Sequence, residues 1–367
     1  MPRHLQTDRW LFGSTVALCL VGAVMVFSAS AVTARDEFGN GYHFLLRQLL
    51  WLVLGLGGMM AMMNVDYRKL RRPEVVFTGL FAVIVLLVGV FFLDKSHATH
   101  RWIRLGPASL QPSELAKLAV IFYLAWFLET RRRSDSFGVN DWKHTIIPAL
   151  GPALVLGGLV VIEPDLGTAV EIFIIAVAML YVAGLHGKYI VGTGLAALPI
   201  VYLLIVRASY RYERVVAFLN PTADPQGRGF QLLQSLIAVG SGGFTGVGLM
   251  ESKQKLFYLP EAHTDFIFAV LCEEMGFIGG ALVLALFAVY GWRGMRAAFK
   301  APDEFGRFAA LGITVMILSQ GMINLGVVLG MMPTKGIPLP FVSYGGSSLL
   351  VMLLATGVLL NISQQAD

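Results

Sequence analysis

The sequence predicts an all-α polytopic membrane protein, and three features of the chain lead to that prediction. Hydrophobic residues make up 56% of it and charged residues only 14%, whereas a soluble domain has about 25% charged residues. The apolar residues gather in runs of the length that a bilayer requires, about 20 residues. The 40 glycines suit helices in lipid, where small residues let backbones approach closely.

Ten apolar runs predict ten membrane-spanning helices within a single domain covering residues 1–367. The first run follows Arg3 and Arg9, but it exceeds the 7–15 apolar residues of a secretory signal, so we expect an uncleaved span. The connections are short except for residues 207–264, between the seventh and eighth helices, where the amphipathic segment 230–243 suits a helix lying along the membrane surface. The expected spans are residues 10–33, 44–64, 75–93, 112–129, 145–162, 168–186, 189–206, 265–291, 307–329 and 344–362.

The Lys and Arg residues of the short connections predict the orientation. Connections on one side carry fifteen of them and those on the other side carry six. Because the richer side faces the cytoplasm, we expect both termini to be cytoplasmic and the long loop 207–264 to be extracytoplasmic. The net charge of +5 is spread over these connections, so it does not indicate binding to nucleic acid.

A carboxylate stands at the outer end of the eighth predicted helix, in the segment LPEAHTDFIFAV (259–270). Asp265, with Thr264 before it and His263 two residues upstream, precedes an apolar run. Asp and Thr are common helix caps, and the residues alone favour that interpretation. The alternative is a partly desolvated carboxylate with a raised pKa, which could act as a base at the membrane surface.

Basic residues also gather on the outer side, against the usual charge bias. They could anchor the protein to anionic lipid head groups, or they could bind an anionic substrate such as a pyrophosphate. With the tryptophan that lies among them, these residues are Arg101, Trp102, Arg104, Arg211, Arg214, Lys253 and Lys255.

Two further segments depart from a plain membrane protein. Glu114 and Lys117 lie at i, i+3 in the fourth span, where charges usually face a partner or a cavity; a structural ion pair and a substrate site remain equally open. The segment 331–350 has three prolines and three glycines and cannot be regular helix. We expect it to line a cavity on the outer face, and Ser343 lies in it. The two cysteines are too few for a disulfide framework or a zinc cluster.

Four segments together resemble the SEDS family (shape, elongation, division and sporulation; FtsW, RodA and SpoVE) in order and spacing. The resemblance covers essentially the whole chain, and the segment 252–266, with Ala262 after Pro-Glu, is closer to the division member than to the elongation member. The segments are RWIRLGPASLQPSELAK (101–117), EPDLGTA (163–169), LPEAHTDFIFAVLCEEMG (259–276) and GIPLPFVSYGGSSLL (336–350).

The resemblance implies a peptidoglycan glycosyltransferase that polymerises lipid II at the outer face of the bacterial cytoplasmic membrane, at the division septum. It implies a class B penicillin-binding transpeptidase (FtsI-like) as partner, together with divisome proteins like FtsQ, FtsL and FtsB. The family's essential aspartate falls on Asp265, its outer-loop tryptophan on Trp102, and its buried pair on Glu114 and Lys117. We therefore expect Asp265 to be the general base.

The other candidates are expected to bind the substrate. The outer arginines and lysines would meet the leaving pyrophosphate, with His263 and Ser343 near the base. A divalent cation, Mg²⁺ or Mn²⁺, could share that task, although the sequence has no evident ligand set for it.

Two other functions remain open from the sequence. A lipid II flippase would also carry charged residues within its spans and a proline-broken segment. A non-enzymatic divisome scaffold would make the outer carboxylate dispensable. Within the family, an elongation polymerase like RodA is the alternative to a division polymerase.

Overall fold

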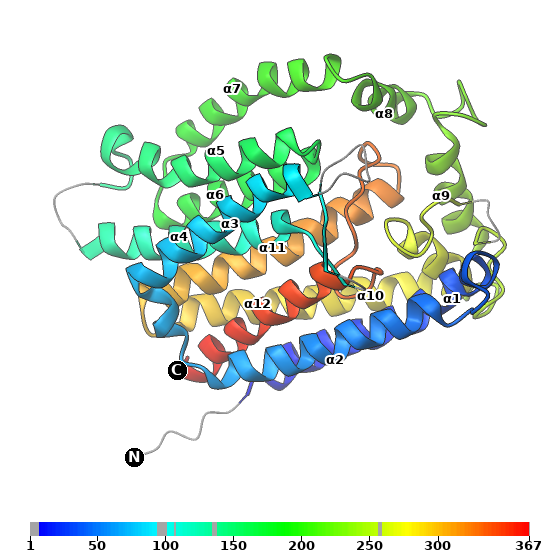
Figure 1. The fold of residues 1–367 in the computed structure, drawn as a ribbon, viewed down its shortest axis with the longest axis horizontal. Helices are drawn as coiled ribbons and strands as arrows, with labels where there is room; N and C mark the ends of the chain where they lie inside the picture. Colours follow the sequence, from blue (N-terminus) through cyan, green and yellow to red (C-terminus); the bar gives the residue numbers. More distant parts are fainter. Residues whose placement is uncertain (1–6, 94–100, 106–107, 134–137, 256–258, 367) are drawn as a thin grey trace.

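Most residues are helical in the computed structural model, which describes residues 7–93, 101–105, 108–133, 138–255 and 259–366. The helices up to the long loop are α1 (Arg9–Phe38), α2 (His43–Asn64), η1 (Tyr67–Arg71), α3 (Pro73–Leu93), α4 (Pro112–Arg133), η2 (Trp142–Ile146), α5 (Ile147–Ile162), α6 (Leu166–Ala183) and α7 (Gly187–Val206). They are followed by α8 (Ser209–Leu219), α9 (Phe230–Ser241), α10 (Ile267–Lys300), α11 (Glu304–Val328) and α12 (Gly346–Gln365). Figure 1 shows the long helices stacked side by side as one bundle.

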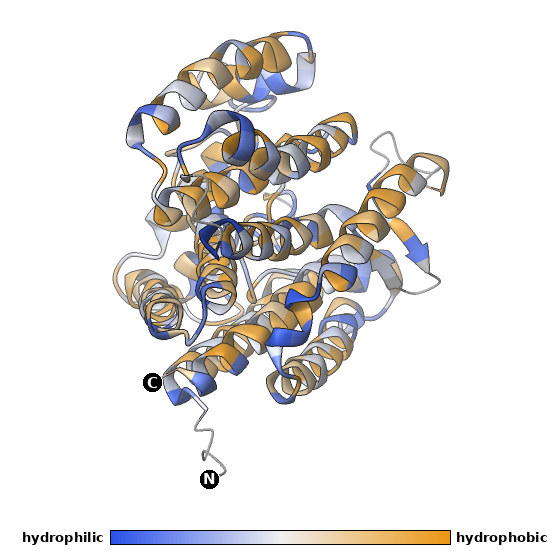
Figure 2. Ribbon diagram, turned by 90° about the vertical axis from the view of Figure 1, so that its left-hand side faces the viewer, coloured by the Kyte–Doolittle hydropathy of each residue, from blue (hydrophilic) through white to orange (hydrophobic). Residues whose placement is uncertain are grey.

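A helix lies over each of the ten predicted ranges, and nine of the described helices are long and apolar enough to cross a membrane. Helix α4 has the length of a span but carries Glu114, Lys117 and Glu129, all buried. These three charges lie inside the bundle and lower the apolar character of α4 without exposing charge along its length. In Figure 2 hydrophobic residues follow the lengths of the helices, and many hydrophilic residues lie at their ends.

The long helices differ in how deeply they are buried. Helices α11 and α12 are mostly buried, and α11 packs against α10, α4 and α6. Helix α7 has no buried residue and lies at the edge of the bundle in Figure 1. The core that positions the site is therefore built from the helices of the C-terminal third together with α4 and α6.

Helix α10 is broken at Gly276, whose φ is 65°. A segment of the long loop docks on this break: the Phe277 amide donates to the Gly243 carbonyl (2.9 Å), and the Val247 amide donates to the Glu273 carbonyl (3.0 Å). These bonds satisfy backbone groups that the interruption leaves without helical partners. A β-carbon at position 276 would lie 2.3 Å from the Gly246 nitrogen, so the docking requires glycine.

Two features of the connections differ from the sequence-based expectation. A hairpin of two three-residue strands, β1 (Ile103–Leu105) and β2 (Ala108–Leu110), lies before α4, with Ile103 opposite Leu110. Strands this short have too few residues to show a period-two pattern. The long loop contains α8 as well as the expected helix near 230–243, so it is more ordered than one interfacial helix.

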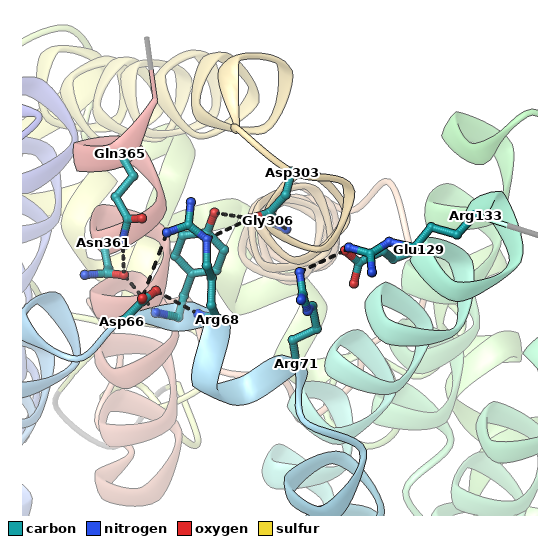
Figure 3. Close-up of polar contacts among 10 residues, drawn as sticks. Asp66, Arg68, Arg71, Glu129, Arg133, Asp303, Gly306, Asn361 and Gln365 are labelled. Atoms are coloured by element: carbon teal, nitrogen blue, oxygen red, sulfur yellow. Dashed lines mark hydrogen bonds and ion pairs between the residues drawn. The ribbon is translucent and has the colours of Figure 1, made fainter.

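A polar network joins η1 to the start of α11 and the end of α4 (Figure 3). The Tyr67 hydroxyl and the Arg68 guanidinium both donate to the Asp303 carboxylate, at 2.8 and 3.1 Å. Nearby, Arg71 donates to Glu129 of α4 at 3.2 Å. The network ties the connection between α2 and α3 to the start of α11 and the end of α4.

Candidate active site

A cavity of about 790 Å³ lies where the hairpin meets the loops that precede α10 and α12. Four of the predicted site residues lie in its wall: Arg101, Trp102, Arg104 and Asp265. They come from segments more than 160 positions apart in the chain, and the fold brings them together. Sequence reasoning missed Arg47 and Trp51 of α2, which also line the cavity.

Asp265 lies in the turn before α10 and does not cap that helix. The residue at the cap position is Phe266, and no side chain hydrogen-bonds to the first amides of α10. Among the described residues the Asp265 carboxylate has no hydrogen-bond donor, and it faces the cavity. The capping role that the residues alone favoured is therefore wrong.

Two buried polar side chains hold the segment that carries Asp265. The side-chain amide of Asn324 in α11 donates to the carbonyls of Asp265 and Ile337, both at 2.8 Å. The Ser343 hydroxyl donates to the Thr264 carbonyl at 2.5 Å and accepts from the Leu339 amide at 2.8 Å. The proline-rich segment 331–350 thus supports the backbone on which the carboxylate stands.

Burial is the main cause that raises the pKa of Asp265 to about 7. The nearby carboxylate of Glu261 raises it further, whereas the guanidinium groups of Arg214 and Arg101 lower it. A carboxylate with a pKa near neutrality suits general-base catalysis, because it is partly ionised at working pH and still takes up a proton. Glu261 lines the same cavity, and its carboxylate accepts a hydrogen bond from the Thr264 hydroxyl at 2.8 Å.

A second cavity, of about 200 Å³, adjoins the first and is rich in basic side chains. Arg101 and Gly336 line both cavities, so the two are neighbours. Arg211, Arg214 and Lys335 complete the basic wall, and burial lowers the pKa of Lys335. Sequence reasoning missed Lys335, although it lies in the proline-rich segment that was expected to line a cavity.

Arg101 is fixed in place by the turn between α5 and α6. Its guanidinium donates to the Glu163 carbonyl at 3.0 Å and also to the Pro164 carbonyl. The Glu163 side chain is fully buried, and both of its carboxylate oxygens lack a hydrogen-bond partner among the described residues. Burial, followed by the charge of Asp165, raises the pKa of Glu163 to about 8, so this side chain is mostly neutral at pH 7.

Glu114 and Lys117 form the core of a buried ion cluster beneath the first cavity. The Lys117 ammonium donates to Glu114 at 3.0 Å, to Glu171 of α6 at 3.1 Å and to Gln320 of α11 at 2.6 Å. Ser348, which lines the cavity, donates to Glu114 at 3.2 Å. The pair therefore joins α4, α6 and α11, and the Ser348 hydroxyl connects it to the cavity.

Lys253 and Lys255, predicted to bind substrate, lie outside the walls of both cavities. The Lys255 ammonium is buried and bonded to Glu274 at 2.9 Å and to Ser28 of α1 at 3.2 Å. The Lys253 side chain is exposed, and its backbone amide donates to Glu273. Lys255 therefore links the long loop to α10 and α1.

His263 and Ser343 also differ from their expected contacts with substrate. The His263 ring lies 4.6 Å from that of Phe44 and 5.7 Å from that of Tyr344, and burial lowers the pKa of the histidine. Neither His263 nor Ser343 is among the described residues that line these two cavities. His263 packs in an aromatic cluster, and Ser343 supports the backbone of Thr264. Among the described residues no group of three His, Cys, Asp or Glu side chains could hold a metal ion.

Comparison with known proteins identifies the family. The family model described as "Cell cycle protein", which covers FtsW, RodA and SpoVE, matches residues 9–367. A probable peptidoglycan glycosyltransferase FtsW of Trichlorobacter lovleyi is 44% identical over 98% of this chain and 94% of the relative. Stage V sporulation protein E of Bacillus subtilis is 46% identical over 95% of both chains.

Solved structures share the fold. A chain of a peptidoglycan synthase complex, described as coordinating polymerization and crosslinking, superposes with a TM-score of 0.79 at 31% identity and 98% coverage of both chains. The rod shape determining protein RodA of Thermus thermophilus superposes with a TM-score of 0.72 at 28% identity over the full length of both chains. Family model, relatives and fold agree, and the protein belongs to the FtsW/RodA/SpoVE family of cell cycle proteins.

Proposed function

We propose that the protein is a peptidoglycan glycosyltransferase that polymerises lipid II, with Asp265 as its general base. The position of the Asp265 carboxylate carries this proposal: it faces a cavity of about 790 Å³, has a pKa of about 7 and stands beside basic side chains. The relative from Trichlorobacter lovleyi, similar over nearly its whole length, is named as a glycosyltransferase of this kind.

In the proposed reaction, the 4-hydroxyl of the acceptor's N-acetylglucosamine attacks the anomeric carbon of the donor's N-acetylmuramic acid. Asp265 takes the hydroxyl proton as the new C–O bond forms. The bond to the diphosphate breaks, undecaprenyl diphosphate leaves with the electron pair, and the anomeric configuration inverts. A positioned base of this kind contributes ~10²–10⁴-fold to the rate.

The second cavity suits the leaving diphosphate. Arg101, Arg211, Arg214 and Lys335 line it, and fixed cations stabilise negative charge that develops on a leaving group. Arg101 lines both cavities, so a diphosphate bound there would lie next to the sugar that Asp265 serves. Trp102 and Arg104, in the wall of the first cavity, are placed to contact the sugars.

The proposed membrane arrangement has ten spans, with α4 as the fourth, in one domain covering residues 1–367. The buried charges of α4 support its assignment as a span, since none of them would meet lipid. The Lys and Arg bias of the short connections supports cytoplasmic termini and an extracytoplasmic loop 207–264. Both cavities would then open at the outer face, where lipid II is consumed.

We propose that a class B penicillin-binding transpeptidase is the partner and that the pair acts at the division septum with other divisome membrane proteins. The similar chain in the peptidoglycan synthase complex supports a crosslinking partner. The relatives named FtsW support division over elongation. Copurification with the cognate transpeptidase tests this assignment.

Asp265→Asn tests the base. Asparagine keeps the size of the side chain but accepts no proton at neutral pH, so polymer formation from labelled lipid II should fall by about two orders of magnitude or more. Purified wild-type and variant protein in detergent, with the cognate transpeptidase, are compared on gels. Asp224→Asn is the matched control, because Asp224 is an exposed carboxylate of the same long loop and should keep full activity.

The assay also separates the alternative functions. A flippase moves lipid II across a bilayer, which is absent in detergent, and a scaffold makes no polymer. Glycan strands made by the wild-type protein would therefore exclude lipid transport or scaffolding as its sole function. Wild-type amounts of polymer from Asp265→Asn would show that Asp265 is not the base.

A further inference from the structure

Asn324 of α11 joins the two segments that form the candidate active site. It is only 1% exposed, and its side-chain nitrogen donates to the carbonyl of Asp265 and to that of Ile337, both at 2.8 Å. Asp265 carries the proposed base, and Ile337 lies two positions after Lys335, which lines the second cavity. One amide group therefore holds the segment of the base beside the segment of a cation of the second cavity.

The carbonyls of residues 263–265 are each held by a different donor. The Tyr344 amide bonds the first at 3.0 Å, the Ser343 hydroxyl bonds the second at 2.5 Å, and the Asn324 side chain bonds the third. Tyr344 and Ser343 belong to the segment 331–350, whereas Asn324 belongs to a mostly buried helix. Of these three donors, Asn324 is therefore the one that fixes the backbone of the base to the core of the bundle.

Gln320 makes a parallel contact one turn earlier in α11. Its side-chain nitrogen donates to the Pro338 carbonyl at 2.9 Å, and its side-chain oxygen accepts from the Lys117 ammonium at 2.6 Å. Because an ammonium group only donates hydrogen bonds, the bond from Lys117 fixes which end of the Gln320 amide faces Pro338. The buried ion cluster thereby orients a group that holds the wall of the first cavity, which Pro338 lines.

The segment held by α11 lies directly against the proposed base. A β-carbon added at Gly336 would be 3.2 Å from a carboxylate oxygen of Asp265, and Gly336 lines both cavities. A shift of this segment would therefore change the position of the second cavity relative to the carboxylate.

The hydrogen bonding of Asn324 shows what its amide is needed for. Its side-chain oxygen is buried and has no hydrogen-bond partner among the described residues. A buried polar group without a partner destabilises the fold, and a leucine of similar size would avoid that cost. The two carbonyls that Asn324 holds therefore explain the residue better than packing does.

We propose that Asn324, assisted by Gln320, is a positioning residue that sets the distance between the Asp265 carboxylate and the second cavity. This inference rests on the proposed function, in which removal of the proton by Asp265 and departure of the diphosphate belong to one displacement. Asn324 is not among the described residues that line either cavity, so it acts through the backbone of residues 265 and 337. A misplacement of about 1 Å in such a geometry costs about 10²-fold in rate.

Asn324→Leu tests the proposal, because leucine keeps the size of the side chain and donates no hydrogen bond. The kcat for polymer formation from labelled lipid II should fall by about 10²-fold. The KM should change little, because the arginines of the second cavity come from segments that Asn324 does not hold.

The pH profile separates positioning from a loss of stability. Burial is the main cause that raises the pKa of Asp265, so release of its backbone should expose the carboxylate to water and lower that pKa. The acid limb of the profile should then move to lower pH in Asn324→Leu. A loss of folded protein would reduce the amount of active enzyme but would leave the acid limb in place.

Asn361→Leu is the matched control. Asn361 of α12 is also a buried asparagine, and its side chain donates to the Met63 carbonyl at 2.7 Å and accepts from the Tyr67 amide at 3.0 Å. It holds the connection between α2 and α3. The control should lower the thermal unfolding midpoint while the folded protein keeps the wild-type kcat and pH profile.

Hydrogen–deuterium exchange gives a readout that does not depend on polymerase activity. In Asn324→Leu the amides of residues 263–268 and 335–342 should exchange faster than in the wild type, whereas Asn361→Leu should leave both segments unchanged. Unchanged exchange or an unmoved acid limb in Asn324→Leu would overturn the proposal, as would the same changes in Asn361→Leu.

Two further outcomes keep the test decisive. If Asn324→Leu does not fold, Asn324→Ser, which retains one hydroxyl donor, is measured in the same way and should show the same changes. If the wild-type protein makes no polymer, the proposed function fails, and the exchange of the two segments still decides whether Asn324 fixes their positions.

Discussion

At the scale of single residues, the pH dependence of the reaction should report Asp265. The ionised carboxylate is the active form of the proposed base, so the rate should fall as the pH drops below the pKa of about 7. Each further unit of pH should cost about tenfold in kcat/KM. The measurement is the rate of polymer formation from pH 5 to 9, with the thermal midpoint followed over the same range.

Two neighbours should move that pH profile in opposite directions. Glu261 raises the pKa of Asp265, so Glu261→Gln should shift the acid limb to lower pH; Arg214 lowers that pKa, so Arg214→Gln should shift the limb to higher pH. Either variant is also expected to change the rate itself, because both side chains line the cavities. An acid limb that stays in place in both variants would mean that another group controls the pH dependence.

The sequence is a better guide to which residues are candidates for the site than to which partners those residues contact. Asp265, Trp102 and Arg101 line one cavity, and each lies in a segment close to the start of a helix that the sequence predicts. The contacts of Lys255 were not predictable, because its charge partner lies on α10 and its hydroxyl partner, Ser28, is 227 positions away. An exposed cation and a buried ion pair look alike in a sequence.

At the scale of helices, the buried cluster around Lys117 should stabilise the packing of α4 against α6 and α11. Lys117 is completely buried and contacts two carboxylates, Glu114 and Glu171. Lys117→Ala would leave both without a cationic partner, and breaking a buried pair costs roughly 3–5 kcal/mol. We expect a clear loss of thermal stability in detergent and a matching loss of folded protein.

Replacing all three charges separates structure from catalysis. The variant Glu114→Gln/Lys117→Met/Glu171→Gln removes the buried charges together and should recover most of the lost stability. Its polymerase activity then decides the role of the cluster. Full activity in a stable triple variant would exclude a direct part in the reaction, whereas a stable but inactive variant would place the cluster in the site.

The break in α10 gives a second prediction for an element. Gly276→Ala would force a β-carbon against the Gly246 nitrogen and impose a φ of 65° on alanine, a strain of about 1–3 kcal/mol before the clash. The variant should unfold at a lower temperature and lose activity, because the half-helix 267–275 leads directly to Asp265. Gly240→Ala in α9 is the control, since its β-carbon would meet nothing within 4 Å. Equal stability of the two variants would contradict the docking argument.

The helices themselves were predictable from the sequence, whereas this break was not. Runs of about 20 apolar residues are dictated by the bilayer, and each predicted range overlaps a helix. Gly276 lies in an apolar stretch that reads as continuous helix, and the backbone groups that replace its helical bonds come from residues 243–248. These replacement hydrogen bonds form only because the long loop folds back onto α10, and the local sequence around Gly276 contains no pattern that predicts such a contact.

At the scale of the whole molecule, the side of the membrane on which each connection lies depends on whether α4 crosses. If all ten helices span, position 138, between α4 and α5, is cytoplasmic and position 226, between α8 and α9, is extracytoplasmic. If α4 does not cross, every later connection changes side, so 138 becomes external and 226 internal. One helix therefore decides whether the long loop and Asp265 lie on the same side of the membrane as the hairpin residues that share the cavity with Asp265.

Labelling of single introduced cysteines can show whether α4 crosses the membrane. The native Cys19 and Cys272 are both buried, so they should react little with a membrane-impermeant maleimide, and Gly138 and Gln226 are both exposed. In intact spheroplasts, Gln226→Cys should be labelled and Gly138→Cys should be protected until the membrane is permeabilised. The reverse pattern would show that α4 does not span, and it would place Asp265 on the opposite side of the membrane from Arg101, Trp102 and Arg104, which precede α4. Because these residues line one cavity with Asp265, that result would contradict the proposed arrangement.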